Sequence, residues 1–413
     1  MLTSSLNRIS IENKSTSFQS IGVFFVYGAT FFSFFPYIRA PQIFFTLADL
    51  LFLLSAVFLM LGKRNEYITK SKIPSSVIFG WVFSSCLIMT GLALSTIING
   101  DPNRGLIVVI QYSFTLFLVP FVYSQLSFEE LKNSARFGIA GVTIVCLFGI
   151  IMYYFFAQYA RPFTMGGRMG SFLENPNSLS KTISIFIPLL MMFSHYKYVR
   201  KWTALIGLFC MIGGLLVASS FGGLLAAVLS LALFLLLSLN LKMIMQTLLA
   251  VGFIIIIGMN ITLPEIFESR IMSYFNSSGQ TSSVGSFDDR SYLNYEALEE
   301  IKKHPFIGIG ADSFEKLTAF QLPVHNTYLN FWVEGGFISL IGLVIFLIII
   351  LLYAIKVWRL NKTVGAAAIS MSITLISNCM TITHIYARFW VVPMILMVLL
   401  VRFYVNQEKQ QER

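Results

Sequence analysis

Residues 337–355 read FISLIGLVIFLIIILLYAI and contain no charged side chain. An α-helix needs about 20 mainly apolar residues to cross the hydrocarbon core of a bilayer. The whole chain shares this character, because 56% of its 413 residues are hydrophobic and only 12% are charged. A soluble domain carries about 25% charged residues. The sequence therefore predicts a polytopic membrane protein and excludes a soluble enzyme, a nucleic-acid-binding domain and a secreted disulfide scaffold.

The apolar runs predict an all-α membrane protein with about twelve transmembrane helices. A polar, glycine-containing break, SSFGG at 219–223, separates two of the runs, so we expect two helices there and not one very long helix. The expected helices cover residues 19–37, 42–62, 74–98, 106–125, 138–157, 178–194, 203–219, 223–239, 243–262, 328–355, 364–382 and 389–405.

The runs divide the chain into three regions. Residues 1–262 hold the first nine helices, 263–327 form one long loop, and 328–413 hold the last three helices and a tail. Short loops rich in Lys and Arg stay in the cytoplasm, and this bias predicts that both termini are cytoplasmic and that the long loop lies on the outer face. Acidic residues at Asp288-Asp289 and basic residues at Lys302-Lys303 predict a helix within that loop.

The outer face gathers polar residues that could carry chemistry. Histidine can accept a proton near neutral pH, and the planar fork of arginine suits a phosphate. Such a set suits a reaction in which a lipid pyrophosphate leaves a sugar while an acceptor hydroxyl attacks it. No metal-binding constellation is present. The polar residues gathered on the outer face are Arg161, Arg168, Glu174, Asn175, Asn177, Arg290, His304, Asp312, His325, Asn326, His384 and Arg388.

Several polar residues have ordinary explanations as well. Arg104 and Arg161 could contact lipid headgroups or solvent, and His304 could contact the last carbonyl groups of a helix. Asp49 is expected near the middle of the second helix, where a carboxylate is a functional candidate by default. A neighbouring helix could equally satisfy it.

Three stretches together resemble a known family. Residues 290–310 read RSYLNYEALEEIKKHPFIGIG, and residues 325–336 read HNTYLNFWVEGG. They resemble the signature of the O-antigen ligase and O-antigen polymerase superfamily, in which an arginine precedes a helix ending in His-Pro-x-x-Gly-x-Gly and a later His-Asn opens the next span. Residues 168–179, RMGSFLENPNSL, resemble its second element, an arginine followed by Asn-Pro-Asn. With the helix pattern and the long outer loop, the resemblance covers nearly the whole chain.

The resemblance implies an inverting glycosyltransferase that uses no metal, cofactor or nucleotide sugar. Its donor would be a glycan on undecaprenyl pyrophosphate at the periplasmic face of a bacterial inner membrane. By the same resemblance, His325 would activate the acceptor hydroxyl and Arg290 would hold the pyrophosphate. Further contacts to donor or acceptor would come from Arg168, Asn177, Asn326 and Arg388.

Two positions depart from the family pattern. Many members carry Ser-Arg-Gly at the turn between helices seven and eight, and that arginine is thought to contact the donor phosphate, whereas this chain has Phe221. We therefore expect Arg168, Arg161 or Arg388 to rebuild the phosphate contact, or the donor to sit differently. Ser339 stands where ligases tend to have Gly or Thr.

Four functions compete. The favoured one is a surface-polysaccharide polymerase, which joins one lipid-linked glycan to another. A ligase that moves the finished glycan to lipid A core uses the same chemistry. A flippase for lipid-linked sugars should concentrate ionisable residues within the bilayer between two related halves, and the sequence shows no repeat. A structural scaffold subunit leaves the loop motifs unexplained.

Overall fold

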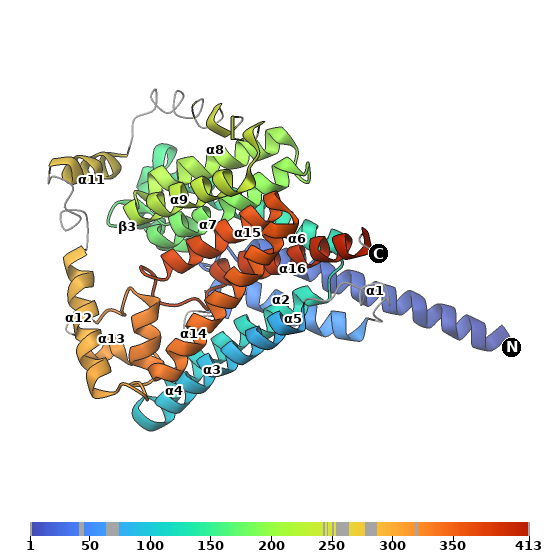
Figure 1. Ribbon diagram of the computed structural model, residues 1–413, viewed down its shortest axis with the longest axis horizontal. Coiled ribbons are helices and arrows are strands. Elements are labelled where there is room, and N and C mark those ends of the chain that lie inside the picture. Colours follow the sequence, from blue (N-terminus) through green and yellow to red (C-terminus); the bar gives the residue numbers. More distant parts are fainter. Residues whose placement is uncertain are drawn as a thin grey trace.

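The computed structural model describes residues 2–40, 45–62, 74–242, 244–245, 247–249, 252, 264–276, 287–318 and 321–411, with side chains omitted at 2–16, 40, 270–271, 273–276, 287–289 and 403–411. Most of this is helix, arranged as one bundle from which the N-terminal part of the first helix projects (Figure 1). The helices are α1 (Leu2–Phe32), α2 (Leu47–Leu61), α3 (Ser75–Asn99), α4 (Pro102–Ser113), α5 (Val119–Ser124), α6 (Phe128–Phe155), α7 (Pro176–His195), α8 (Lys201–Ala218), α9 (Phe221–Ser238), α11 (Glu265–Asn276), α12 (Phe287–Lys303), α13 (Phe314–Leu317), α14 (Thr327–Leu360), α15 (Lys362–Asn378) and α16 (Arg388–Gln411).

The remaining elements are short. A π-helical turn, η2 (Phe114–Leu118), joins α4 to α5, so that Pro102–Ser124 runs as one helix. Three 3₁₀ turns and one strand pair lie between α6 and α7, namely η3 (Ala157–Tyr159), η4 (Arg161–Phe163), β3 (Thr164–Met165), β4 (Arg168–Met169) and η5 (Ser171–Leu173). A second antiparallel pair, β1 (Arg39–Ala40) with β2 (Phe45–Thr46), precedes α2.

Most expected spans correspond to helices in the structure. In the described part of the chain, seven helices are long and apolar enough to cross a membrane, and two shorter apolar segments lie at Ser17–Phe32 and Leu47–Leu61. The expected break at 219–223 is confirmed, because Ser219 adopts a left-handed conformation (φ 46°) between α8 and α9. The expected span 243–262 falls mostly outside the described residues, and the total of twelve remains a prediction.

Within the described residues of the long loop lie the helices α11, α12 and α13. Helix α12 lies at the end of the bundle where α14 begins (Figure 1). Its buried side consists of Leu293, Ala297 and Ile301, which pack with Phe314 and Val333. The expected helix between the acidic and basic pairs is therefore confirmed.

Helices α3 and α14 pack along each other and form the frame of this part of the bundle. Ser339 is fully buried at their contact, and its hydroxyl donates to the carbonyl oxygen of Ile88 over 3.1 Å. The residue that departs from the ligase pattern thus fills a packing position between two helices.

Candidate functional site

We call one end of the bundle the site end: there α2, α4, α7, α9, α14 and α16 begin, and α1, α3, α6, α8 and α15 end. Each helix start needs groups to satisfy its first backbone amides. Asn175 caps α7 in this way, and Asn326 caps α14 by accepting hydrogen bonds from the amides of Tyr328 (3.0 Å) and Leu329 (3.3 Å). Asn326 thus has a local structural role, and its expected part in ligand binding stays a prediction.

The segment between α15 and α16, residues 379–387, organises the site end. The backbone amide of Thr327, at the start of α14, donates to the carbonyl oxygen of Cys379 (2.7 Å), and its hydroxyl donates to that of Ile382 (2.8 Å). Further along, the ring of His384 stacks on that of Tyr386 with centroids 3.9 Å apart. The segment is therefore fixed against α14 just beside His325.

His325 lies directly against this segment. Its Nδ1 atom is 3.4 Å from the hydroxyl oxygen of Thr383. Burial lowers the pKa of His325 to about 4, and the positive charges of Arg290 and Lys181 lower it further in the same direction. Burial also lowers the pKa of His384 to about 4, with a smaller effect from His325. Both imidazoles are neutral at pH 7, and His325 is thus in the form that can accept a proton.

The structure brings Arg290 and His325 together, as the resemblance implies, and adds a cation that the sequence analysis missed. Lys181 of α7 is 2% exposed, and its Nζ donates to the carbonyl oxygen of Thr381 (2.7 Å). Arg290, Lys181 and His325 interact electrostatically. A lysine inside an apolar span is itself a functional signal. Its place in the sequence, one helical turn after Asn177 in NPNSLSK, could have revealed it.

Arg168 reaches the turn between α8 and α9. Its Nη2 donates to Oδ1 of Asn177 (2.9 Å), and its Nε donates to the carbonyl oxygen of Ala218 (3.2 Å). The hydroxyl of Ser220 also donates to Oδ1 of Asn177 (2.9 Å). The tight turn between β3 and β4, at Gly166 and Gly167 with φ of 57° and 72°, sets this reach, since such dihedrals favour glycine.

The guanidinium of Arg168 therefore lies at the turn where many family members have an arginine in place of Phe221. Phe221 itself is the first residue of α9. Arg161, the other arginine of this loop, is exposed on η4. Of the two arginines, Arg168 is the one held against Asn177 and the α8–α9 turn.

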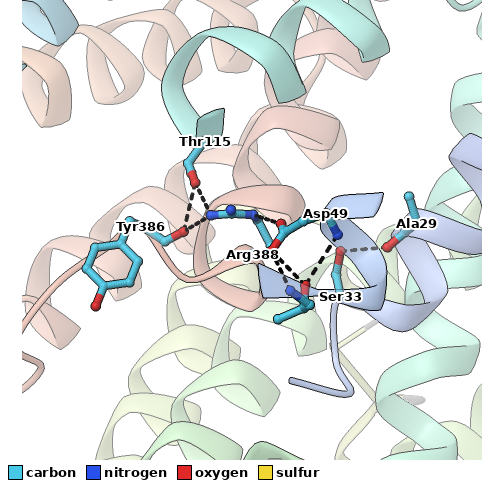
Figure 2. Close-up of polar contacts among 7 residues, drawn as sticks. Ala29, Ser33, Asp49, Thr115, Tyr386 and Arg388 are labelled. Atoms are coloured by element: carbon cyan, nitrogen blue, oxygen red, sulfur yellow. Dashed lines mark hydrogen bonds and ion pairs between the residues drawn. The ribbon is translucent and has the colours of Figure 1, made fainter. Parts of the chain in front are cut away.

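Arg388 is bound within the protein (Figure 2). Its Nε lies 2.5 Å from Oδ1 of Asp49, and its Nη1 donates to the hydroxyl of Thr115 and to the carbonyl oxygen of Tyr386 (2.6 Å). Arg388 is 8% exposed and Asp49 is 1% exposed. The charge of Arg388 is thus neutralised, and its expected contact with donor or acceptor stays a prediction that this pairing does not favour.

The expected position of Asp49 was wrong. Helix α2 begins at Leu47 because Thr46 caps it, and the amide of Thr46 donates back to Oδ2 of Asp49 (2.9 Å). This reciprocal capping box places Asp49 in the first turn, not near the middle of the helix. Its partners are Thr46 and Arg388, so a neighbouring element does satisfy it.

The glycines of the His-Pro-x-x-Gly-x-Gly motif serve a backbone contact. Helix α14 is kinked at Gly336 (φ 73°), which frees the carbonyl groups of Val333 and Glu334. The amides of Ile309 and Gly310 donate to these carbonyl oxygens over 2.9 and 3.0 Å. Helix α12, which carries Arg290, is thereby tied to the first turns of α14, which follow His325.

The other predicted residues form ion pairs or helix ends. Arg104 pairs with Asp312 (3.0 Å), and its side chain stays 45% exposed. His304 follows the last residue of α12, and its amide donates to the carbonyl oxygen of Glu300 (3.0 Å). Within the described ranges, no three His, Cys, Asp or Glu side chains are grouped as a metal site.

Comparison with known proteins bears on this arrangement. Residues 206–344 match the family model described as O-antigen ligase. This match supports the assignment of the chain to the O-antigen ligase and polymerase superfamily. The match runs from α8 into α14, and so includes Arg290, the glycine motif and His325, whereas Arg168 and Lys181 precede it. A search of curated proteins finds no match to the chain.

The match fits the helical architecture. The apolar helices, together with the matched family model, indicate a polytopic membrane protein. The match does not separate ligase from polymerase activity.

Proposed function

We propose that this chain is a surface-polysaccharide polymerase of the O-antigen type. It transfers a glycan from undecaprenyl pyrophosphate to a sugar hydroxyl of an acceptor glycan, with inversion and without a metal ion. The observation that carries the proposal is the grouping of His325 with Arg290 and Lys181 beside segment 379–387. A neutral base next to two cations matches the needs of a neutral nucleophile and an anionic leaving group.

In the proposed step, His325 accepts the proton of the acceptor hydroxyl as its oxygen attacks the anomeric carbon. The bond between that carbon and the pyrophosphate oxygen breaks on the opposite side, which inverts the configuration. The leaving pyrophosphate gains negative charge, which Arg290 and Lys181 stabilise. Since the same cations lower the pKa of His325, a bound pyrophosphate should raise it and make His325 a stronger base.

Arg168 provides the second part of the proposed pyrophosphate contact. Asn177, which holds Arg168, and Lys181 are four residues apart on α7, so their side chains point from the same face of that helix. One helix thereby links the arginine at the α8–α9 turn with the cations near His325. We infer that a lipid-linked pyrophosphate is held along this face.

The alternative function is a ligase that transfers the glycan to lipid A core, and the description of the matched family favours it. A lipid-linked oligosaccharide flippase is the less favoured third candidate. In all three cases we propose a bacterial inner membrane location, cytoplasmic termini and a periplasmic site end, so that the partners are the lipid bilayer, the lipid-linked donor and a glycan or lipid A core acceptor.

Deletion of the gene in the parent strain, followed by gel analysis of extracted surface glycans, tests these functions. Loss of a polymerase leaves core that bears a single repeat unit. Loss of a ligase leaves bare core and accumulated lipid-linked polymer, and loss of a flippase traps single repeats on the inner leaflet. Complementation with wild type and with His325→Ala provides the controls, because only the wild type should restore polymer.

A further inference from the structure

A cavity of about 550 Å³ opens next to His325, on the far side of Thr383. Its walls come from the first turns of α14 and α16, from α4, and from the segments that follow α1 and precede α7. Thr383 both contacts His325 and lines the cavity. His384 lines the cavity as well. A molecule in this cavity that contacts Thr383 would therefore be separated from the proposed base, His325, by that one side chain.

The arginines of the cavity wall are all neutralised by carboxylates. Arg39 pairs with Glu174 over 3.1 Å, and Arg104 pairs with Asp312 over 3.0 Å. Arg388 pairs with Asp49, as described above. His384 adds no charge at pH 7, because burial lowers its pKa to about 4. Among the described residues, the wall thus offers no uncompensated cation, and it differs in this respect from the neighbourhood of Arg290 and Lys181.

Two further carboxyl groups of the wall, those of Glu315 and Glu334, are not paired with an arginine. In the described part of the chain, neither has a Lys, Arg or His nitrogen within 4.0 Å. Because the arginines are already paired and these carboxyl oxygens face no cation, the described wall has nothing to balance the charge of a phosphate or of any other anion, which makes it a poor place for one. The pyrophosphate of the donor therefore belongs with Arg290, Lys181 and Arg168, and not in this cavity.

The polar groups at the start of α14 suit hydroxyl groups. Asn330 and Glu334 are each 6% exposed, lie one helical turn apart and both line the cavity. Nδ2 of Asn330 donates to Oε2 of Glu334 (3.3 Å), whereas Oδ1 of Asn330 accepts no hydrogen bond from the described residues. A buried acceptor without a donor is costly. A rotation of the Asn330 amide towards the cavity would let a sugar hydroxyl or amine supply that donor.

The ring of Tyr386 is partly exposed and lines the same cavity, backed by the rings of Tyr112 and Phe331, which are 2% and 1% exposed. Tyr112, Phe331 and Tyr386 line it, and the ring of Tyr112 packs edge-on against the other two, with centroids 5.4 and 5.2 Å apart. A wall that combines aromatic rings with a few fixed polar groups is typical of sites for small organic ligands. A pyranose, which has apolar C–H faces and polar edges, matches both features.

We propose that this cavity binds the terminal sugar of the acceptor glycan and that it selects uncharged or amine-bearing sugars against acidic ones. The inference rests on the proposed function, since it places the acceptor hydroxyl beside His325. It goes further by naming the class of sugar: one without a carboxylate or phosphate. Asn330 and Glu334 are the residues that determine this selectivity.

Saturation-transfer NMR on the purified full chain in lipid nanodiscs can test the selectivity. The probes are the methyl β-glycosides of glucose and galactose, their 2-amino counterparts and the corresponding uronic acids. We expect the neutral or amino glycosides to bind at least about tenfold more tightly than the uronic acids, equivalent to about 1.4 kcal/mol. Equal or tighter binding of the uronic acids, or no binding of any probe, would overturn the proposal.

Variants locate the binding and its charge dependence. Asn330→Ala should weaken binding of the neutral probes about tenfold, whereas Asn103→Ala, an exposed asparagine of α4 outside the cavity wall, should not. Glu334→Gln should keep neutral binding and remove any preference for the amino probes. Asp312→Asn, which frees Arg104, should improve binding of the uronic acids about tenfold. Binding that none of these substitutions changes would place the sugar elsewhere and refute the proposal.

A His325→Ala variant separates this inference from the proposed function. It should lose glycan transfer and keep the binding selectivity, because His325 is not part of the cavity wall. Transfer that survives in His325→Ala, together with unchanged selectivity, would refute the proposed function of His325 and leave the sugar site standing. A wild-type protein that shows no preference for neutral or amino glycosides over uronic acids would refute the sugar site but not the proposed function.

Discussion

The ion pair between Asp49 and Arg388 makes a strong prediction about stability. The pair joins α2 to α16, Arg388 is 8% exposed, and Asp49 is 1% exposed. The substitution Asp49→Asn leaves the guanidinium buried without a counter-charge. Breaking a buried pair in this way costs about 3–5 kcal/mol of unfolding free energy, so we expect a clear loss of thermal stability for the purified protein in detergent.

A double variant shows whether the loss comes from the uncompensated charge. Asp49→Asn combined with Arg388→Met removes both charges, and replacement of a buried pair by apolar groups is often neutral for stability. We therefore expect the double variant to regain most of the lost stability. The exposed pair between Lys302 and Glu299 is the matched control, since exposed pairs contribute about 0–1 kcal/mol.

The assay is the unfolding midpoint followed by intrinsic fluorescence, together with the yield of monodisperse protein. A single variant Asp49→Asn as stable as wild type would refute the reasoning that the pair is buried and structural. Activity adds a second measure. If the double variant is stable but cannot transfer glycan, Arg388 contributes to substrate binding after all, as the family resemblance implies.

Further predictions concern the proposed base and cations. His325→Ala should reduce transfer by about 10²–10⁴-fold, and activity within about threefold of wild type would exclude it as the base. Because the pKa of His325 is lowered to about 4, the histidine stays unprotonated until the pH approaches that value. We therefore expect kcat/KM to stay constant from about pH 7 to about pH 5 and to decline only towards pH 4. A decline centred near pH 6.5 would contradict this. Lys181→Met should lower transfer at least about tenfold while the protein still inserts, and wild-type activity would remove it from the site. Both Arg168→Lys and Arg168→Ala should lose activity, because lysine lacks the planar fork, whereas Arg161→Ala should be tolerated; the reverse pattern would identify Arg161 as the phosphate ligand. Since no metal-ligand cluster is present among the described residues, transfer by purified enzyme should survive excess EDTA, and loss of activity that Mg²⁺ restores would reveal a missed site.

The sequence revealed the helices and the motif residues because both are encoded locally. An apolar run needs no partner to be recognised, and the helix of 287–303 followed from its end charges and its apolar positions. His325 and Arg290 followed from short motifs. Their proximity did not, since it depends on how the loop folds back on α14.

Other features depend on contacts between distant positions. The position of Asp49 was misjudged because one residue, Thr46, sets the start of α2. Its partner Arg388 lies 339 positions away, and no local pattern links the two. Lys181 was missed although it lies within an apolar run, and its contact with Thr381 and its interactions with Arg290 and His325 identify it as part of the site.

The contact at the kink of α14 has a consequence for how a substrate enters. The loop after α12 binds the freed carbonyl groups beside Gly336, and it is also tied to α3. Nδ2 of Asn99 donates to the carbonyl oxygen of Gly308 (3.0 Å), and the amide of Ala311 donates to the hydroxyl of Thr96 (3.0 Å). The loop after α12 is thus hydrogen-bonded both to α14 at the kink and to α3. The first turns of α14 therefore cannot move away from α3 without breaking these bonds.

We expect a bulky lipid-linked molecule to enter from another side of the site end. The candidate is the side formed by α8, α9 and the β3–β4 hairpin, which is held to α8 by the bond from Arg168 to Ala218. We expect distances between spin labels on α9 and α14 to broaden in the free protein and to narrow when donor binds, whereas distances between α3 and α14 stay fixed. In that case the α3–α14 side of the protein stays fixed while donor binds, and the α8–α9 side moves.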